Sequence, residues 1–191
     1  MSGRLLETDR LILRRWAARD LAPFAALNAD PEVMRHFPRT LDRAESDALV
    51  ARLEDRRAEE GIGFVVAERR ADRAFLGMVG LSRVRFEPLD GAVEVGWRLA
   101  RAHWGQGYAT EAARAWLDHG FAELGLAEIV AFTVPENLAS RRVMRRLGLE
   151  HDPARDFAHP HLPEGHRLRA HLLHALSRER WEKGAARADR A

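Results

Sequence analysis

The chain has 191 residues, of which 46% are hydrophobic and 31% charged, and its formal net charge is +2. This composition is typical of a globular protein with a sizeable core, and it argues against a disordered or fibrous chain. The sequence contains no cysteine, which excludes disulfide bonds, thiolate metal sites and a cysteine nucleophile.

Charge and hydropathy patterning give expectations about partners and compartment. The arginines are interleaved with acidic residues, whereas nucleic-acid binding usually needs a basic stripe, so no nucleic-acid partner is expected. No apolar run is long enough to cross a membrane and no signal-peptide core precedes the first strand. We therefore expect a cytoplasmic protein without a membrane partner. One domain over residues 1–183 and a flexible tail over residues 184–191 are the simplest organisation.

The first third of the chain predicts one strand followed by two helices. Residues 8–16 alternate as a strand does, and Asp20 is placed to cap a helix that continues through Leu27. The residue before a proline avoids the helical region, so Asp30 before Pro31 marks the end of this helix. A second helix is expected over residues 43–59.

The middle of the chain changes from helical to alternating periodicity. Residues 63–68, 75–82 and 93–97 predict three strands, and their closeness in sequence favours an antiparallel arrangement. Residues 112–122 then carry apolar side chains at helical spacing. A loop rich in glycine joins the third strand to this helix.

The last third predicts one strand, one helix and further strand. Residues 129–134 form a β-branched run, and a helix over residues 141–147 opens near Asn137 and closes at Gly148. Residues 168–177 alternate loosely and predict a final strand. The succession of elements indicates an α+β fold with a mixed sheet.

The glycine-rich loop has a chemical use. The first turn of a helix has N–H groups without intrahelical partners, and the helix dipole makes that end partly positive. Gly105 and Gly107 carry no Cβ, so a bulky anion can approach the backbone there. A phosphate or pyrophosphate is the guest that such a loop favours.

Two familiar phosphate loops do not match. A P-loop ends in Gly-Lys-Ser or Gly-Lys-Thr, but Tyr108 follows Gly107 and the only lysine is Lys183. A dinucleotide fingerprint needs a third glycine where this chain has Thr110, which argues against an NAD-dependent oxidoreductase. An ordinary strand-to-helix turn remains an alternative.

The run Trp104-Gly105-Gln106-Gly107-Tyr108-Ala109 resembles the pyrophosphate loop of the GNAT N-acetyltransferases, Gln/Arg-x-x-Gly-x-Gly/Ala. Gly107 and Ala109 occupy its small positions, and Trp104 stands where the family has Gln or Arg. The longer form Trp-Gly-x-Gly-Tyr-Ala-Thr-Glu-Ala is similar to the branch of the ribosomal-protein alanine N-acetyltransferases. The resemblance implies the GNAT fold, with a mixed central sheet of about seven strands flanked by about four helices. It also implies a splayed strand pair that holds acetyl-CoA.

The resemblance also implies which residues contact acetyl-CoA. Backbone groups of the strand end pair with the pantetheine arm, loop amides hold the pyrophosphate, and one asparagine contacts the cofactor. For that asparagine, a plain helix cap is the alternative. The residues so implied are Trp97, Arg98, Leu99, Trp104, Gly105, Gln106, Gly107, Tyr108, Ala109, Thr110 and Asn137.

Direct transfer of an acetyl group to a primary amine needs a base for the amine and a proton donor for the thiolate. Glu94, on the strand beside the cofactor, is the candidate base, with a solvated or salt-bridged glutamate as the alternative. The family's tyrosine position is Met144 here, and the only tyrosine, Tyr108, lies in the loop. Ser140 is the candidate group near the sulfur, with a helix cap as the alternative.

The acceptor would be a small-molecule amine or a protein N-terminus. Its wall is expected from two sets, namely Trp16, Phe24, Met34 and Phe37, and the histidine loop with His159, His161 and His166. The histidine spacing lacks the pattern of a metal site, so no metal is expected. The missing tyrosine also leaves open a non-catalytic domain that binds acyl-CoA. Relatives commonly form dimers, and no feature of this sequence requires a homodimer.

Overall fold

The computed structural model describes residues 3–188. The chain divides into two compact units, the first made of Met1–Ser82 and Gly96–Trp116 and the second of Arg83–Val95 and Leu117–Ala191. Among the described helices, none combines the length and apolar character needed to cross a bilayer.

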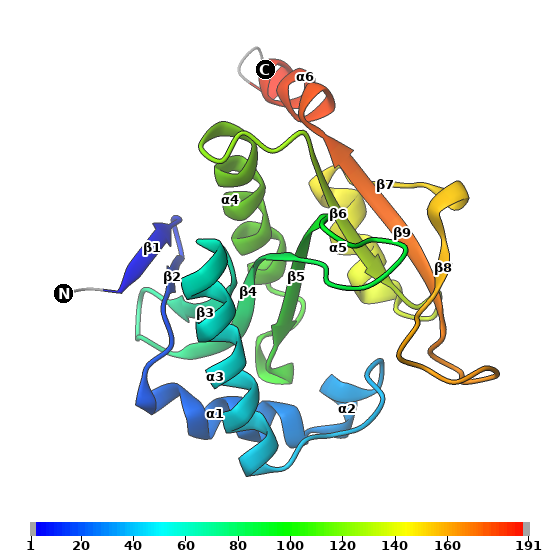
Figure 1. Cartoon of the computed structure of the whole chain (residues 1–191). Helices are drawn as coiled ribbons and strands as arrows, with labels where there is room; N and C mark the ends of the chain where they lie inside the picture. The colour runs from blue at the N-terminus through cyan, green and yellow to red at the C-terminus, as the bar shows by residue number, and fades with distance from the viewer. Residues whose placement is uncertain (1–2, 189–191) are drawn as a thin grey trace. The chain divides into compact units, whose positions relative to one another are not determined.

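The first unit is a four-stranded antiparallel sheet with helices packed on it. Its strands follow one another in the order β1-β2-β3-β4. The elements are β1 (Arg4–Glu7), β2 (Leu11–Arg14), α1 (Ala18–Ala29), α2 (Pro31–Met34), α3 (Arg43–Glu60), β3 (Phe64–Arg69) and β4 (Phe75–Arg83), and a 3-10 turn spans Arg101–His103. Helices α1 and α3 lie side by side (Figure 1). Two elements continue from one unit into the other, β5 (Val93–Leu99) and α4 (Tyr108–Ala122).

Local chemistry sets the helix ends in this unit. The Asp42 side chain accepts the Glu45 N–H at 2.8 Å at the start of α3, and Gly61 ends that helix in the left-handed conformation. Asp20 was expected to precede α1 as its cap. The helix instead begins at Ala18, and the Asp20 carboxylate accepts the Ala17 N–H at 2.8 Å from inside the first turn.

An apolar core fills the space between the helices and the sheet of the first unit. It joins residues of α1, α2, α3 and β4 and consists of Phe24, Leu27, Val33, Val50, Leu53 and Met78. The Trp16 ring packs against the Phe24 ring with centroids 4.7 Å apart. Burial of such side chains supplies most of the driving force that fixes α1 and α3 on the sheet.

The second unit is built on β6 and β9, which pair over their whole length and lie side by side in Figure 1. Its further elements are β6 (Glu128–Thr133), α5 (Leu138–Leu147), β7 (Glu150–His151), a 3-10 turn (Pro153–Arg155), β8 (Phe157–Ala158), β9 (Ala170–Ser177) and α6 (Arg178–Ala188). Strand β5 is parallel to β6, with Glu94 opposite Val130, whereas β7 and β8 are antiparallel to β9. The sheet is therefore mixed, and the predicted α+β class is confirmed.

The described residues form nine strands and six helices, which exceeds the seven and four expected from the sequence. The additional elements are short, such as α2, β7 and β8, and too short to leave a periodic pattern. Helix α6 continues through Gly184 to Ala188, where a flexible tail was expected, and residues 189–191 lie outside the described part. The single-domain organisation and the splayed strand pair stay predictions.

Candidate functional site

The loop between β5 and α4 is a turn that only glycine accommodates easily. Gly105 and Gly107 have φ angles of +75° and +82°, in the left-handed region that side chains rarely adopt. Helix α4 begins at Tyr108, four residues earlier than the sequence pattern predicts. Its first turn therefore contains Tyr108, Ala109 and Thr110, whose N–H groups are not used within the helix.

Two side chains of the loop donate hydrogen bonds to carbonyl groups of the residues just before the loop. The Trp104 indole N–H donates to the Leu99 carbonyl at 2.8 Å. The Gln106 amide donates to the Ala102 carbonyl at 3.1 Å. These two contacts hold the loop against the 3-10 turn and the end of β5, and the Trp104 backbone N–H also donates to the Arg101 carbonyl at 3.1 Å.

Glu111, in the first turn of α4, joins this helix to the N-terminal strands. Its carboxylate accepts the Thr8 hydroxyl at 2.5 Å, the Arg10 N–H at 3.0 Å and the Arg10 Nε–H at 2.6 Å. Burial alone would raise the pKa of Glu111, but these hydrogen bonds and the Arg10 charge outweigh it, so the pKa is lowered. A charged Glu111 therefore fixes the loop before any ligand arrives.

Arg10 is a residue of this site that sequence reasoning missed. Its Nη1 donates to the Gln106 carbonyl at 3.0 Å, and its guanidinium lies 4.7 Å from the centre of the Tyr108 ring. Since Arg10 and Gln106 are 96 positions apart, no short-range pattern points to their contact. The only local hint is the charged turn between the first two strands.

The side chain of Arg98 turns from β5 toward α1. Its Nη1 donates to the Asn28 Oδ1 at 2.6 Å, and its guanidinium lies 4.0 Å from the centre of the Phe37 ring. Burial lowers the pKa of Arg98 to about 10. The exposed Arg101 side chain reaches Asp30 instead, at 3.5 Å.

Two of the four residues predicted for the acceptor wall in the first unit, Phe24 and Met34, are wrong. Phe24 and Met34 are buried in its apolar core, with 0% and 4% of their surface exposed. The Trp16 indole N–H is occupied by the Phe64 carbonyl at 2.9 Å. Phe37 is partly buried and faces the Arg98 guanidinium, whose carbon lies 4.0 Å from the ring centre. A role of Trp16 and Phe37 in the acceptor wall stays a prediction.

Asn137 caps helix α5 in the second unit. Its Oδ1 accepts the Ser140 N–H at 3.2 Å, and its Nδ2 donates to the Thr133 hydroxyl at 3.0 Å. From the sequence, either Asn137 or Ser140 could be the cap of this helix. The structure shows that Asn137 is the cap and that Ser140 supplies the N–H that Asn137 accepts. Met144, at the family's tyrosine position, is buried with 2% of its surface exposed.

Glu94 lies on β5 opposite Val130 and is half-buried. The strand predicted over residues 93–97 is thus confirmed as part of β5. Its role as a base stays a prediction.

Two of the three loop histidines belong to an aromatic cluster in the second unit. The His159 ring lies 4.8 Å from Phe86, 5.1 Å from His171 and 5.5 Å from His161. Burial, with contributions from His171 and His161, lowers the pKa of His159 to about 4. His166 lies outside this set, and its Nδ1 accepts the Leu168 N–H at 3.1 Å.

Metal ligands are not gathered anywhere in residues 3–188, since no group of three His, Asp or Glu side chains has the arrangement to hold an ion.

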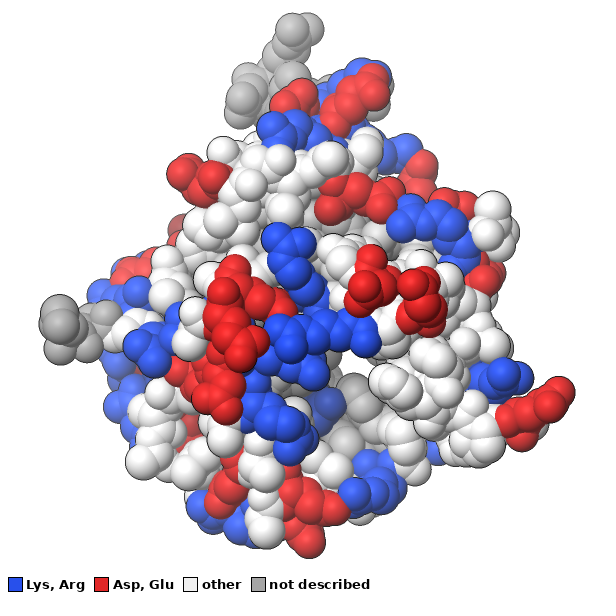
Figure 2. All heavy atoms as spheres, viewed as in Figure 1, with Lys and Arg blue, Asp and Glu red and all other residues white. Residues whose placement is uncertain are grey.

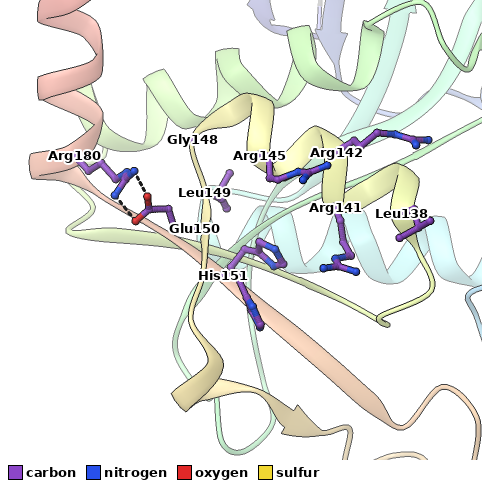
Figure 3. A pocket seen from close by; sticks show the side chains of 10 residues that line it. Leu138, Arg141, Arg142, Arg145, Gly148, Leu149, Glu150, His151 and Arg180 are labelled. Atoms are coloured by element: carbon purple, nitrogen blue, oxygen red, sulfur yellow. Dashed lines mark hydrogen bonds and ion pairs between the residues drawn. The ribbon is translucent and has the colours of Figure 1, made fainter.

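A basic hollow of about 680 Å³ lies in the second unit, between α5 and the β7–β9 edge (Figure 3). Helix α5 contributes Arg141, Arg142 and Arg145, and His151 lies below Arg145 in the view. The His151 ring stacks on the His174 ring with centroids 5.2 Å apart. On the opposite wall the carboxylate of Glu150 pairs with Arg180. None of these residues was predicted as a site residue.

Charges of both signs alternate over the visible face of the protein (Figure 2). Many are paired, such as Arg39 with Glu45 at 2.5 Å and Arg43 with Asp47 at 2.8 Å. Basic and acidic residues that are interleaved in the sequence thus form ion pairs in the structure.

A family model and proteins of similar sequence match most of the chain. The family model for the acetyltransferase (GNAT) domain matches residues 10–150. The Bacillus subtilis protein YkkB is 36% identical over 147 residues, which cover 76% of this chain and 85% of YkkB. The Bacillus subtilis N-acetyltransferase YnaD is 28% identical over 177 residues, covering 92% of this chain and 98% of YnaD.

Solved structures share the fold. A GNAT-family acetyltransferase from Bacillus anthracis superposes with a TM-score of 0.77 at 23% identity, over 91% of this chain and 98% of that protein. Mycobacterium smegmatis RimJ, solved in complex with CoA-disulfide, gives a TM-score of 0.69 at 22% identity, over 92% and 89% of the two chains. The fold of the suspected branch is therefore present here. With its loop, its topology and a family match over residues 10–150, the chain belongs to the GNAT acetyltransferase domain family.

Proposed function

We propose that this protein transfers the acetyl group of acetyl-CoA to a primary amine by direct transfer. The single observation that carries the proposal is the loop of residues 104–110, which opens α4 and is fixed by Glu111. Membership of the GNAT family and the N-acetyltransferase name of the relative YnaD support it. The acceptor is a small-molecule amine or a protein N-terminus.

The residues of the loop fit a pyrophosphate. A Cβ at Gly105 would meet no atom within 4 Å, so the space beside its backbone is open. Amides of residues 105–110 would donate to the pyrophosphate oxygens, favoured by the dipole of α4. The Trp104 N–H already donates to the Arg101 carbonyl at 3.1 Å, so this residue would contribute through its position in the loop. The backbone of residues 97–99 would pair with the pantetheine arm, and the Asn137 side chain would contact the same ligand.

In the reaction the amine nitrogen attacks the thioester carbonyl carbon, the C–S bond breaks and an amide forms. Glu94 would take a proton from the ammonium form of the acceptor, directly or through water, so that the neutral amine attacks. The departing thiolate must gain a proton or a hydrogen bond, and Met144 cannot supply either. Ser140, in the first turn of α5, would donate its hydroxyl to the sulfur.

Ligand-induced stabilisation tests the cofactor first. Acetyl-CoA at a hundred times its dissociation constant should raise the free energy of unfolding by about 2.7 kcal/mol, and CoA should act similarly, whereas NAD should not. Failure of both CoA species to shift the melting temperature would contradict the pyrophosphate loop.

An amine panel with mass-spectrometric detection then tests the transfer. The panel should contain polyamines, free amino acids and peptides with different N-terminal residues. Appearance of a product heavier by one acetyl group, dependent on acetyl-CoA, is the expected result. Tight acetyl-CoA binding without acetylation of any amine would instead support a domain that only binds acyl-CoA.

A further inference from the structure

Arg98 is held in an unusual environment within the first unit. The only hydrogen bond of its side chain among the described residues goes from Nη1 to the Asn28 Oδ1, at 2.6 Å. Asn28 is fully buried, and its own Nδ2 donates to the Ser46 hydroxyl at 2.9 Å. Ser46 thereby fixes the amide so that its oxygen faces Arg98, and Phe37 covers one face of the guanidinium.

The guanidinium lacks the counter-charge that burial normally demands. No carboxylate in residues 3–188 pairs with Arg98, and its buried Nε–H has no hydrogen-bond partner. Burial is also the sole cause that lowers its pKa to about 10. Removing a charge from water without a compensating partner is strongly unfavourable.

Arg14, a second buried arginine of the same unit, is paired with carboxylates and can be compared with Arg98. The Arg14 guanidinium donates to the Asp20 carboxylate at 2.7 and 2.8 Å and to Glu68 at 2.7 Å. Two acids thus compensate Arg14, whereas Arg98 has one neutral amide and one ring. The contrast indicates that the partner of Arg98 arrives with a ligand.

The phosphates of a CoA ligand are not the best match for that partner. The pyrophosphate loop is organised by Arg10, which contacts Gln106 and Tyr108. The Arg98 side chain leaves β5 toward α1 and the α2–α3 connection, where Asn28 and Phe37 lie. A planar guanidinium with unused N–H groups is suited to a carboxylate.

We propose that Arg98 binds a carboxylate of the acceptor, so that the acceptor is an amine that carries a carboxylate within a few bonds, as an amino acid does. This inference rests on the proposed acetyl transfer. Asn28 and Ser46 act as positioning residues, since they orient the guanidinium without touching the ligand. A polyamine would meet the positive charge of Arg98 without gaining a partner, and it is therefore a poor acceptor.

Binding measurements test this proposal without relying on turnover. The probes are the twenty amino acids and the same twenty as C-terminal amides, each titrated calorimetrically into the protein saturated with CoA. We expect at least one acid to bind roughly ten- to a hundredfold more tightly than its amide, the range for a charge-assisted pair. Arg98→Met should abolish this preference, and Arg98→Lys should retain part of it.

Arg101→Met is the matched control, because Arg101 follows on the same segment but is exposed and reaches only Asp30. It should keep the preference for the acid. The melting shift produced by CoA reports whether each variant is folded, and Arg98→Lys serves if Arg98→Met does not fold.

Three results would overturn the proposal. These are equal affinities of acids and amides for the wild-type protein, no binding of any amino acid, and a loss in Arg98→Met of CoA affinity alone. Failure of the proposed function looks different. In that case acids would still bind more tightly than amides through Arg98, but no amine would be acetylated.

Discussion

Arg10 and Glu111 are 101 positions apart in the sequence, yet the Arg10 Nε–H donates to the Glu111 Oε2 at 2.6 Å. This contact fastens the first turn of α4 to the N-terminal strands. Because the turn supplies the amides of the phosphate loop, its rigidity determines how much ordering a ligand must still impose.

Glu111→Gln should lower both stability and acetyl-CoA affinity. The neutral amide weakens the bonds from Thr8 and Arg10, and we expect a loss of roughly 1–3 kcal/mol in the free energy of unfolding. Glu123→Gln, at an exposed position in the same region of sequence, is the control and should change neither quantity. Chemical denaturation and titration with acetyl-CoA measure the two effects.

The stabilising effect of Glu111 should also depend on pH. Its folded-state pKa lies below the ordinary 4.5, so the unfolded chain binds the proton more readily. The contribution is therefore complete above about pH 4.5 and is lost as the pH falls through the folded-state pKa. Melting temperatures of wild type and Glu111→Gln should converge on acidification below pH 4.5. A constant difference down to low pH would contradict the assignment.

Gly107→Ala should weaken acetyl-CoA binding more than its cost in stability explains. At φ +82° an alanine is strained by roughly 1–2 kcal/mol, and its Cβ would lie 3.4 Å from the Arg10 Nη2. Gly61→Ala offers a matched comparison, since Gly61 has φ +75° and ends α3. Both variants should melt earlier, but only Gly107→Ala should lose affinity. Equal affinities in the two variants would argue against the loop as the phosphate site.

Asn137→Asp separates the two roles of Asn137. The aspartate keeps the oxygen that caps α5, so the melting temperature should stay close to that of wild type. It replaces the Nδ2 donor by a negative charge, which should repel a CoA ligand and reduce its affinity. Asn137→Ala should lower both quantities, with roughly 1 kcal/mol lost from stability. If Asn137→Asp bound acetyl-CoA as tightly as wild type does, Asn137 would act only as a helix cap.

Glu94→Gln should reduce kcat by roughly a hundred- to ten-thousandfold, the usual contribution of a positioned general base. Ser140→Ala should reduce kcat by a smaller factor, because it removes one hydrogen bond to the thiolate. Neither variant should alter the melting shift caused by acetyl-CoA. Unchanged turnover in both variants would show that the proposed mechanism is wrong.

His159 makes the second unit sensitive to mild acid. Its folded-state pKa of about 4 lies below the ordinary 6.5, so protonation favours the unfolded chain between these values. His159→Phe removes that proton site and should flatten the fall in melting temperature between pH 7 and pH 4. The variant also loses the acceptor for the His161 N–H, a cost that should not vary with pH. Parallel curves for the two proteins would contradict the lowered pKa.

Local signals explain which features could be predicted from the sequence. The helix over residues 43–59 and the strands over residues 63–68 and 75–82 match α3, β3 and β4 within one residue at most ends. The glycine-rich loop was also located, because Gly105 and Gly107 mark it between a strand pattern and a helix pattern, and both glycines have a left-handed backbone in the structure. Such features depend on residues within a few positions of one another.

Contacts between distant segments explain what could not be predicted. The ties of Glu111 to Thr8 and Arg10 connect positions about a hundred residues apart. Phe24 and Met34 were interpreted as part of the acceptor wall, but both are buried in the core. The sequence alone does not distinguish an apolar side chain in a core from one that lines a pocket. Sequence likewise did not reveal that Arg98 turns toward Asn28.

The long reach of Glu111 has a consequence for folding order. Strands β1 and β2, and likewise β3 and β4, can pair as hairpins as soon as they are synthesised, because their contacts span short stretches of chain. The loop of residues 104–110 acquires its fixed geometry only when Glu111 closes a contact across 103 positions to Thr8. If the loop binds acetyl-CoA as proposed, this binding should be gained late in folding, after the strands that hold the loop have paired.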